Sequence, residues 1–506
     1  MPRPARGSLF GDTRRRLEVR LLFTHEERGP VEPTVELLRA APGFETARAM
    51  NTTFDAIIIG AGQAGPSLAG RLTTAGMTVA IVERHLFGGT CVNTGCTPTK
   101  TLIASAEVAH QARRAAEYGI RLSGDISTDM AAVKKRKESV VAASRNGLES
   151  WLRGMERCTV FNGHARLESE RDVRIGDTLI SAKRIFLNVG GRAVVPRLPG
   201  IDEVPYLTNT SILELDSLPR HLVVIGGSYI GLEFAQMYRR FGSEVTVIEM
   251  GPRLIWREDP DVSTAIETLF KNEGITVRTA AECIRFDTSA GQIVAGVDCK
   301  VGSPQVPGSH VLLAVGRRPN TDDLGLDRAG VATDAHGYIT VDDQLRTSVE
   351  GIWALGDCNG RGAFTHTAYN DFEIVAGNLL EGRSRKVSDR IPCYALFVDP
   401  PLGRVGMTEA QARAAGRKVR IGKRPMTRVA RAVEKGESQG FMKVVVDDDT
   451  REILGAAILG VGGDEAVHAI IDTMSAKAPY TTLRDTMHIH PTVSELIPTI
   501  LGEMQA

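Results

Sequence analysis

Two glycine-rich loops, each placed between a short apolar strand and a helix, constrain the fold of this chain more than any other feature. The first loop reads GAGQAG and contains Gly60, Gly62 and Gly65. In such a loop the first glycine allows a tight turn, the second lets a pyrophosphate approach the backbone, and the third lets helix and strand pack closely. The flanking elements are predicted at 54–59 (strand), 64–75 (helix) and 78–82 (strand).

The second loop, GGSYIG, repeats the arrangement with Gly226, Ser228 and Gly231. Ser228 stands where a glycine is usual, but its small side chain compromises a close backbone approach only mildly. The flanking elements are predicted at 222–225 (strand), 229–241 (helix) and 244–248 (strand). The chain therefore contains two copies of one strand–loop–helix–strand unit, which predicts a parallel α/β architecture.

A carboxylate ends the second strand of each unit, 23 residues after the first glycine of its loop. These residues, Glu83 and Glu249, can accept hydrogen bonds from ribose hydroxyls. One such loop alone is often only a helix-entry turn, but two with matching carboxylates predict two bound dinucleotides. Glu249 would repel a 2′-phosphate and so favours NADH over NADPH, although Arg253 is close enough in sequence to leave both open.

A cysteine pair lies between the two units, in the segment FGGTCVNTGCTPTK. Cys91 and Cys96 would be about 140° and ~7.5 Å apart on an ideal helix, whereas a disulfide needs Cα atoms within ~7 Å. The helix must therefore be distorted, and Gly95 is the residue that permits this. Pro98 fits a first helical turn, which places Cys96 near a helix N-terminus that stabilises a thiolate.

The other interpretations of this pair are two structural cysteines or half of a metal site. No second cysteine pair stands at zinc spacing, so no metal site is predicted. The remaining five cysteines are scattered, and small buried hydrophobic residues are the ordinary interpretation of each. Cys91 and Cys96 are therefore predicted to be a redox couple.

Composition excludes several classes of protein. The chain has 506 residues, enough for roughly three domains. Its 61 basic and 61 acidic residues balance, which gives no electrostatic footprint for nucleic acid. An odd number of dispersed cysteines, seven, is not a secreted disulfide framework. No uncharged run approaches the ~18 residues of a membrane helix, so a cytoplasmic enzyme without membrane contact is predicted.

The remaining segments differ in character. Residues 1–49 are rich in Arg and Pro and lack a strand period, so they are predicted to be a disordered extension, or translation begins at Met50; a small regulatory appendage is the alternative. Residues 101–150 are predicted to be helical, and 320–385 to carry loops and a helix. After about residue 389 the pattern predicts antiparallel strands and a helical stretch at 464–478, which indicates a separate C-terminal domain.

Five motifs in one order now identify a resemblance. GAGQAG, GGTCVNTGCTPTK, GGSYIGLE, IWALGDC and HIHPTVSE make the chain similar to the pyridine nucleotide–disulfide oxidoreductases, from about residue 52 to the C-terminus. The resemblance implies an α/β fold with two Rossmann-like domains, for FAD and NAD(P), and a C-terminal α+β dimerisation domain. The implied segments are 1–49 (extension), 50–198 (FAD), 199–319 (NAD(P)), 320–388 (completing the FAD site) and 389–506 (dimerisation).

The resemblance also implies roles for individual residues. Cys91 would be the thiol that attacks the substrate, and Cys96 the charge-transfer thiol beside the flavin. Lys100 would lie near flavin N5 and pair with Glu233, since a buried lysine needs a carboxylate partner. Tyr229 matches the aromatic gate over the nicotinamide pocket.

Two further motifs carry implied roles. Gly356 and Asp357 match the pair that holds the FAD ribitol, because a carboxylate accepts hydroxyl hydrogen bonds strongly. His490 would be the acid–base catalyst, oriented by Glu495, and a histidine titrates near neutrality. In this family the histidine reaches the cysteines of the other subunit, so the resemblance implies a homodimer.

The predicted reaction carries hydride from NAD(P)H through FAD to the Cys91–Cys96 disulfide and on to a disulfide or similar electrophile. A mercuric-reductase-like reduction of Hg(II) or Cu(II) is the first alternative, although no cysteine follows Cys393 to make the paired-cysteine tail of those enzymes. A dihydrolipoamide dehydrogenase is the second, although Thr97 and Thr99 differ from its usual residues. A non-catalytic flavin redox sensor is a hypothesis of another class.

Overall fold

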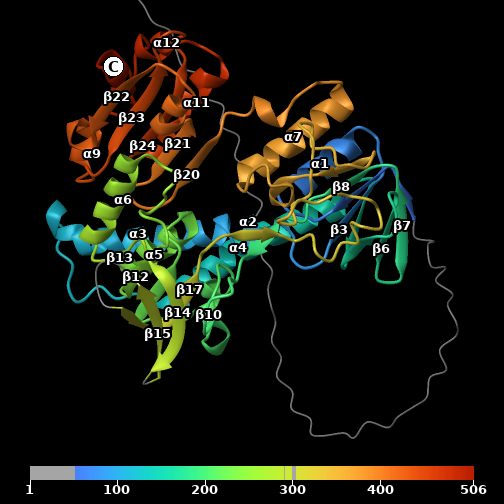
Figure 1. The fold of residues 1–506 in the computed structure, drawn as a ribbon, viewed down its shortest axis with the longest axis horizontal. Helices are drawn as coiled ribbons and strands as arrows, with labels where there is room; N and C mark the ends of the chain where they lie inside the picture. Colours follow the sequence, from blue (N-terminus) through green and yellow to red (C-terminus); the bar gives the residue numbers. More distant parts are fainter. Residues whose placement is uncertain (1–51, 290, 299–303, 506) are drawn as a thin grey trace, which may run out of the picture. The chain divides into compact units, whose positions relative to one another are not determined.

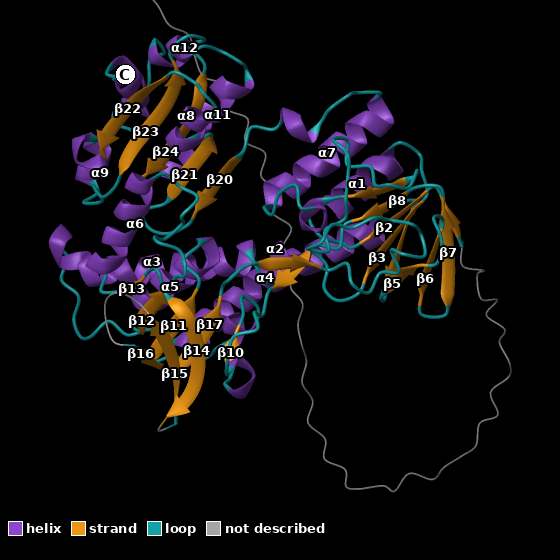
Figure 2. Ribbon diagram, in the orientation of Figure 1, coloured by secondary structure: helices purple, strands orange, loops and turns teal. Residues whose placement is uncertain are grey.

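The computed structural model describes residues 52–289, 291–298 and 304–505 (Figure 1). The predicted extension at 1–49 lies outside these residues. Two parallel sheets, one antiparallel sheet and three smaller sheets account for the strands of the described residues (Figure 2). The two parallel sheets carry the two glycine loops, so they position the site.

The first parallel sheet contains the strand that leads into the first loop. Its strands, in spatial order, are β19 (Ile352–Ala354), β8 (Ile185–Leu187), β2 (Ala56–Ile59), β3 (Val79–Glu83) and β4 (Cys158–Asn162). Every neighbouring pair is parallel. The central strand β2 is buried throughout because helices cover both faces of such a sheet. The segment 320–388 contributes β19 and α7 (Thr365–Glu381), which packs against α1 (Ala64–Thr74).

The second parallel sheet repeats this topology around the second loop. Its order is β10 (Tyr206–Leu207), β17 (His310–Leu313), β11 (His221–Ile225), β12 (Glu244–Ile248) and β13 (Thr276–Arg278). Helix α5 (Tyr229–Phe241) follows the loop, and α6 (Pro260–Asn272) connects β12 to β13. The predicted duplication is confirmed, because the strand before each loop is the central strand of a five-stranded parallel sheet.

The C-terminal sheet is antiparallel, as predicted after residue 389. Its order is β20 (Cys393–Leu396), β21 (Leu402–Gly406), β24 (Ile453–Leu459), β23 (Phe441–Asp447) and β22 (Val419–Pro425). Strands β23 and β24 are completely buried, so helices must cover the sheet. The predicted helical stretch is α10 (Gly463–Ala466) followed by α11 (His468–Ser475).

Smaller sheets complete the described chain. β1 (Thr53–Phe54), β7 (Thr178–Ala182), β6 (Asp172–Ile175) and β5 (Ala165–Leu167) form one; β14 (Glu282–Ser289), β15 (Gln292–Asp298) and β16 (Gln305–Gly308) form another; β18 (Arg317–Pro319) pairs with β9 (Gly191–Ala193). No helix of the described residues is both long enough and apolar enough to cross a membrane.

The predicted helical region 101–150 needs a correction. Two long helices occupy most of it, α3 (Cys96–Arg114) and α4 (Met130–Gly154), but residues 119–129 between them are not helical. Gly119 and Gly124 lie in this connection with φ of 75° and 83°. Glycine reaches such angles without strain and commonly ends a helix there, so the chain turns at Gly119.

Candidate active site

The first glycine loop is packed against the end of the neighbouring strand β8. Gly60 has φ of 102°, and a Cβ there would lie 2.3 Å from the backbone oxygen of Asn188. A Cβ at Gly65 would lie 2.4 Å from the Gly60 oxygen, so this glycine lets α1 pack on the loop. The side-chain amide of Asn188 also donates to the Gly60 oxygen at 3.2 Å. Only glycine fits at Gly60 and Gly65, as the motif predicts.

The second loop shows the same constraints. Gly226 has φ of 112°, and a Cβ at Gly231 would lie 2.0 Å from the Gly226 oxygen. Ser228 is the residue that precedes α5 and makes no side-chain cap hydrogen bond. Neither α1 nor α5 has an acidic residue in its first turn, so the partial positive charge of each helix N-terminus is available to an anion.

The two strand-end carboxylates already have backbone partners. Glu83 accepts from the N–H of Ala61 and of His85, both at 2.9 Å. Glu249 accepts from the N–H of Gly227 and of Gly251, both at 2.6 Å. Each carboxylate therefore fixes the loop beside it, a role that the spacing alone did not indicate. A carboxylate has about four lone-pair sites, so both retain capacity to accept from a ribose.

The cysteine segment is distorted where predicted. Cys91 lies in a short helix, α2 (Gly89–Asn93), and Cys96 is the first residue of α3. Gly95 lies between the two helices, and a Cβ there would be 2.9 Å from the Thr90 oxygen. The prediction that Cys96 stands at a helix N-terminus, with Gly95 as the point of distortion, is confirmed.

The two sulfur atoms are inequivalent. Both cysteines are free thiols, and each acts on the pKa of the other. The interaction with Cys91, and after it the hydrogen bond with Thr365 and the charge of Lys100, outweighs burial and lowers the pKa of Cys96 to about 6. The interaction with Cys96, together with burial, raises the pKa of Cys91 well above the ordinary thiol value. Cys96 is therefore the thiolate of the pair at neutral pH, and Cys91 the thiol.

Thr365 contacts Cys96, and Lys100, the last residue of the cysteine segment, acts on it through its charge. Thr365, the first residue of α7, has its Oγ1 3.2 Å from Cys96 Sγ. Lys100 lies one turn along α3, and its Nζ is 2.6 Å from Glu233 Oε2. Glu233 is buried on α5 and also accepts from the N–H of Phe397 at 3.1 Å. The predicted Lys100–Glu233 pair is thus present, and it links the two loop-bearing units.

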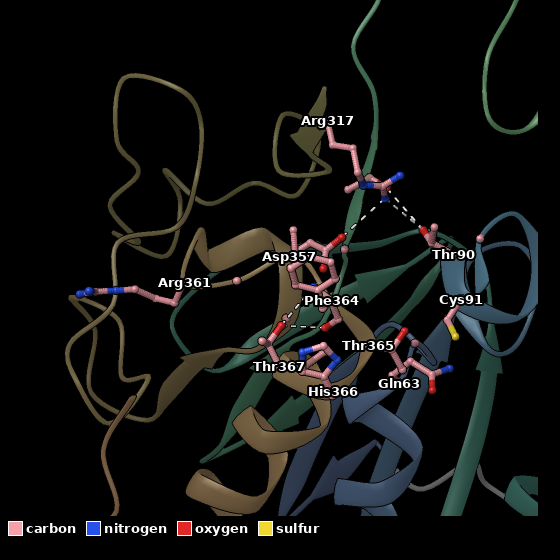
Figure 3. A pocket seen from close by; sticks show the side chains of 18 of the residues that line it. Gln63, Thr90, Cys91, Arg317, Asp357, Arg361, Phe364, Thr365, His366 and Thr367 are labelled. Atoms are coloured by element: carbon pink, nitrogen blue, oxygen red, sulfur yellow. Dashed lines mark hydrogen bonds and ion pairs between the residues drawn. The ribbon is translucent and has the colours of Figure 1, made fainter. Parts of the chain in front are cut away.

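A partly buried carboxylate, Asp357, lies near the first loop. Gly356 has φ of 74°, and Asp357 follows it in a short 3₁₀ turn. Burial raises the pKa of Asp357, and Arg317 opposes the shift with its Nη2 at 3.6 Å. Figure 3 shows the same guanidinium directed at both Asp357 and Thr90, the residue before Cys91. Arg317 therefore connects the carboxylate to the cysteine segment.

One cavity of about 2820 Å³ brings most of the predicted residues together. This volume is several times that of an ordinary small-molecule pocket, so it can hold more than one extended ligand. The predicted residues on its wall are Gly60, Gly62, Glu83, Cys91, Cys96, Lys100, Gly226, Ser228, Tyr229, Glu233, Glu249, Gly356 and Asp357. Gly65 and Gly231 are absent from the wall, as their packing role requires.

His490 and Glu495 do not line this cavity. His490 Nδ1 lies 2.8 Å from Glu495 Oε2, so the predicted pair forms within the chain. The histidine side chain is 76% exposed, however, whereas the glutamate is only 11% exposed. Glu495 thus fixes the orientation of the imidazole through Nδ1, and Nε2 has no hydrogen-bond partner among the described residues.

The sequence reasoning missed Asn188, Arg317 and Thr365. Asn188 follows β8 and Arg317 lies just beyond β17, so both stand past the carboxyl end of a parallel strand, where ligands bind in open α/β sheets. Thr365 begins α7 and meets Cys96 across 269 residues of sequence. The position of Asn188 and Arg317 after a parallel strand could have indicated a role in ligand binding. Nothing in the sequence indicates the contact of Thr365 with Cys96. Among the described residues, no group of three His, Cys, Asp or Glu side chains could hold a metal ion.

Two protein-family models match this chain. Residues 54–371 match the model described as pyridine nucleotide-disulphide oxidoreductase, and residues 393–500 match the dimerisation domain of the same family. The first match alone covers more than half of the chain.

Several similar proteins match this chain over most of its length. The chain is 36% identical to the probable pyridine nucleotide-disulfide oxidoreductase RclA of Escherichia coli, over 87% of this chain and 97% of that protein. It is 33% identical to a dihydrolipoyl dehydrogenase of Chlamydia muridarum, over 88% and 96%. It is 33% identical to a mercuric reductase of Bacillus cereus, over 88% and 70%.

Solved structures agree with these matches. The HOCl-induced flavoprotein disulfide reductase RclA from E. coli matches with a TM-score of 0.81 at 35% identity, over 89% of this chain and 99% of that one. A Cu(II) complex of the same reductase matches with a TM-score of 0.81 at 34% identity, over 89% and 99%.

Proposed function

Because the chain belongs to the pyridine nucleotide-disulphide oxidoreductase family, we propose that it uses NAD(P)H and FAD to reduce a disulfide, or a similar electrophile, through Cys91 and Cys96. The observation that carries this proposal is the polarised thiol pair on the wall of a cavity that both glycine loops share. A thiolate beside a thiol is the state that a reduced, exchange-competent cysteine pair must reach.

The residues of the first loop fit FAD. Gly60 leaves no room for a side chain, α1 offers an unopposed N-terminus for phosphates, and Glu83 and Asp357 offer carboxylate oxygens for hydroxyl groups. When bound, FAD supplies the ability to accept two electrons from a nicotinamide and return them to a disulfide. Lys100 and Glu233 would then provide a fixed, paired charge next to Cys96.

The second loop would hold the nicotinamide dinucleotide, and we infer a preference for NADH from the surroundings of Glu249 and Arg253. Arg253 could bind a 2′-phosphate, but its Nη2 already donates to the backbone oxygens of Trp256 at 3.0 Å and Glu258 at 3.3 Å. Glu249 remains at the end of β12 to accept from a ribose and repel a phosphate. Tyr229, the first residue of α5, would cover the nicotinamide end.

The exchange steps follow from the pKa values of the two thiols. Cys91 has a raised pKa, so a base must remove its proton before it attacks. His490 of the partner subunit, oriented by Glu495, would take that proton. The Cys91 thiolate attacks one sulfur of the substrate disulfide, and the leaving thiolate takes the proton back. The Cys96 thiolate then attacks Cys91 Sγ, which re-forms the Cys91–Cys96 disulfide and expels the second sulfur as a thiolate that takes a proton from solvent.

Reduction with one equivalent of NADH under anaerobic conditions tests this function. We expect a long-wavelength band from the Cys96 thiolate next to oxidised flavin, and a weaker response to NADPH. Rapid turnover with lipoamide or glutathione disulfide would support a disulfide acceptor and exclude a non-catalytic sensor. An intact flavin spectrum without this band, and without turnover of any acceptor, would refute the proposal.

A thiophilic metal ion is the second candidate acceptor. The solved Cu(II) complex of the E. coli reductase and the similarity to a mercuric reductase both favour it. A pair of closely spaced thiols is a suitable ligand for soft metal ions. Steady NADH oxidation that depends on Cu(II) or Hg(II), and that exceeds the rate with any disulfide, would favour this alternative.

A further inference from the structure

The carboxylate proposed to hold FAD, Asp357, belongs to a short 3₁₀ turn at Gly356–Asn359. The turn follows β19, the edge strand of the first parallel sheet, and Asp357 lines the shared cavity. Gly356 and Asn359, the two ends of the turn, are buried. A helical segment this short has few hydrogen bonds of its own, so the place of Asp357 depends on what fixes these ends.

Asp371 contacts both ends of this turn. Its Oδ2 accepts from the N–H of Gly356 at 2.7 Å and from the side-chain amide of Asn359 at 2.9 Å. The same amide donates to the oxygen of Ala354, the last residue of β19, at 3.0 Å. The Asp371 side chain is 2% exposed and is absent from the cavity wall that the described residues form. It therefore fixes the turn from behind and does not touch a ligand itself.

Arg390 holds the other oxygen of Asp371. Its Nη2 donates to Asp371 Oδ1, and its Nε donates to Asn370 Oδ1 at 2.7 Å. The Arg390 side chain is 15% exposed, so the ion pair is largely removed from water. Separating such a pair would leave an uncompensated buried charge, which keeps Asp371 in place. Arg390 stands three residues before β20, where the chain enters the C-terminal domain, so the turn is tied to this segment as well.

Asp371 also fixes the turn relative to the cysteine pair, because it lies on α7. Thr365, the first residue of that helix, has its Oγ1 3.2 Å from Cys96 Sγ. Asp371 follows six residues later, ~9 Å along the helix axis. One continuous helix therefore contacts Cys96 at its first residue and the turn of Asp357 further along. A shift of α7 would move both contacts together.

We propose that Asp371 is a positioning residue, which holds the turn of Asp357 and the start of α7 in one arrangement and so sets both the retention of FAD and its register with Cys96. This inference rests on the proposed function, since it takes FAD as the ligand of the turn. Asparagine at this position keeps the size of the side chain but replaces one acceptor oxygen by an NH₂ group. That group must face donors either on the turn or on Arg390, so one of the two connections is lost.

Release of FAD from the diluted holoenzyme, followed by flavin fluorescence, tests the proposal without turnover. In Asp371→Asn we expect release about tenfold faster than in the parent, the effect of one lost hydrogen bond to a charged group. With FAD in excess, the long-wavelength band after one equivalent of NADH should lose intensity, because Cys96 and the flavin are no longer held in register. Arg390→Lys keeps the charge but loses the planar fork that reaches Asn370 and Asp371, so release should be about threefold faster.

Asp447→Asn is the matched control. Asp447 is also a buried carboxylate beside an arginine, with its Oδ2 2.8 Å from Arg417 Nε, and its Oδ1 accepts from two backbone N–H groups. It lies on β23, away from the cavity wall, so this variant should lose stability without faster release of FAD. Equal release rates in Asp371→Asn and Asp447→Asn, or an unchanged band in Asp371→Asn, would overturn the positioning role. If Asp371→Asn does not fold, a release rate in Arg390→Lys equal to that of the parent overturns it. A parent protein that binds no FAD would instead refute the proposed function.

Discussion

The cysteine pair and the histidine–glutamate pair have the same sequence spacing. The cysteines lie on the wall of the cavity in their own chain, whereas the histidine and glutamate do not. Cys91 and Cys96 are five residues apart, as are His490 and Glu495. The two cysteines of the first pair shift each other's pKa in opposite directions, and Thr365 from a distant helix contacts Cys96. The second pair has its internal contact, but the imidazole is 76% exposed and outside the cavity.

This difference indicates which half of the reaction one chain performs alone. The reducing half needs only groups that already lie on the cavity wall. The proposed exchange half also needs a base, and His490 of the same chain does not line that wall. Ile489 is 80% exposed and Met487 is 95% exposed beside His490, within the region that matches the dimerisation domain. Apolar side chains exposed next to an oriented histidine fit a surface that a second subunit covers.

The largest expected effect comes from Cys96→Ser. If Cys96 is the thiolate beside the flavin, as proposed, the long-wavelength band should be absent and turnover with any disulfide should fall at least about 10³-fold. Anaerobic spectra after one equivalent of NADH measure the band. A variant that kept the band would show that Cys91 is the flavin-side thiol, and the assignment of the two cysteines would be reversed.

His490→Gln should impair only the exchange half. We expect kcat/KM for the disulfide to fall about 10²- to 10³-fold, the usual contribution of a general acid–base. The rate of flavin reduction by NADH, followed by stopped-flow absorbance, should not change because no group of that half touches His490. Slower flavin reduction in this variant would contradict the claim that His490 acts only in the exchange half.

Mixed dimers test whether Cys91 and His490 of one site come from different chains. Cys91→Ser and His490→Gln should each be inactive alone, but a heterodimer of the two has one site with both native groups. Refolding or co-expressing equal amounts should give half heterodimers, and therefore about a quarter of wild-type activity. Activity no higher than that of the separate variants would place His490 and Cys91 of one site in the same chain.

Glu495→Gln should have a smaller effect than loss of the histidine itself. A glutamine can still accept from Nδ1 of His490, so the orientation is kept and only the negative charge is lost. We expect kcat/KM for the disulfide to fall about tenfold, while the rate of flavin reduction by NADH stays the same. Steady-state and stopped-flow kinetics of both proteins measure these two rates, and an unchanged kcat/KM would mean that the charge of Glu495 has no role in the exchange half.

How much the sequence predicts differs between these regions for a physical reason. The glycine loops, Glu83 and Glu249 follow from rules that act within one strand–loop–helix unit, and the distortion at Gly95 follows from helix geometry. Thr365 could not be predicted, because its contact with Cys96 spans 269 residues and depends on how α7 packs. The sequence does not indicate that Glu83 and Glu249 accept from backbone N–H groups. A carboxylate at a strand end can accept equally well from a ribose hydroxyl or from the N–H groups of the neighbouring loop.

The smallest effect concerns the pKa of Cys96, which lies at about 6. Its thiolate is favoured above that pH, so the long-wavelength band of the NADH-reduced protein should decline as the pH falls through about 6. Thr365→Val removes a hydrogen bond that stabilises the thiolate, so the pKa should rise and the band should begin to decline at a pH higher by up to about one unit. Thr365→Ser keeps the hydroxyl and serves as the control. If the band declines at the same pH in the valine and serine variants, Thr365 packs against Cys96 without stabilising its negative charge. The lowered pKa of Cys96 would then come from Cys91 and Lys100 alone.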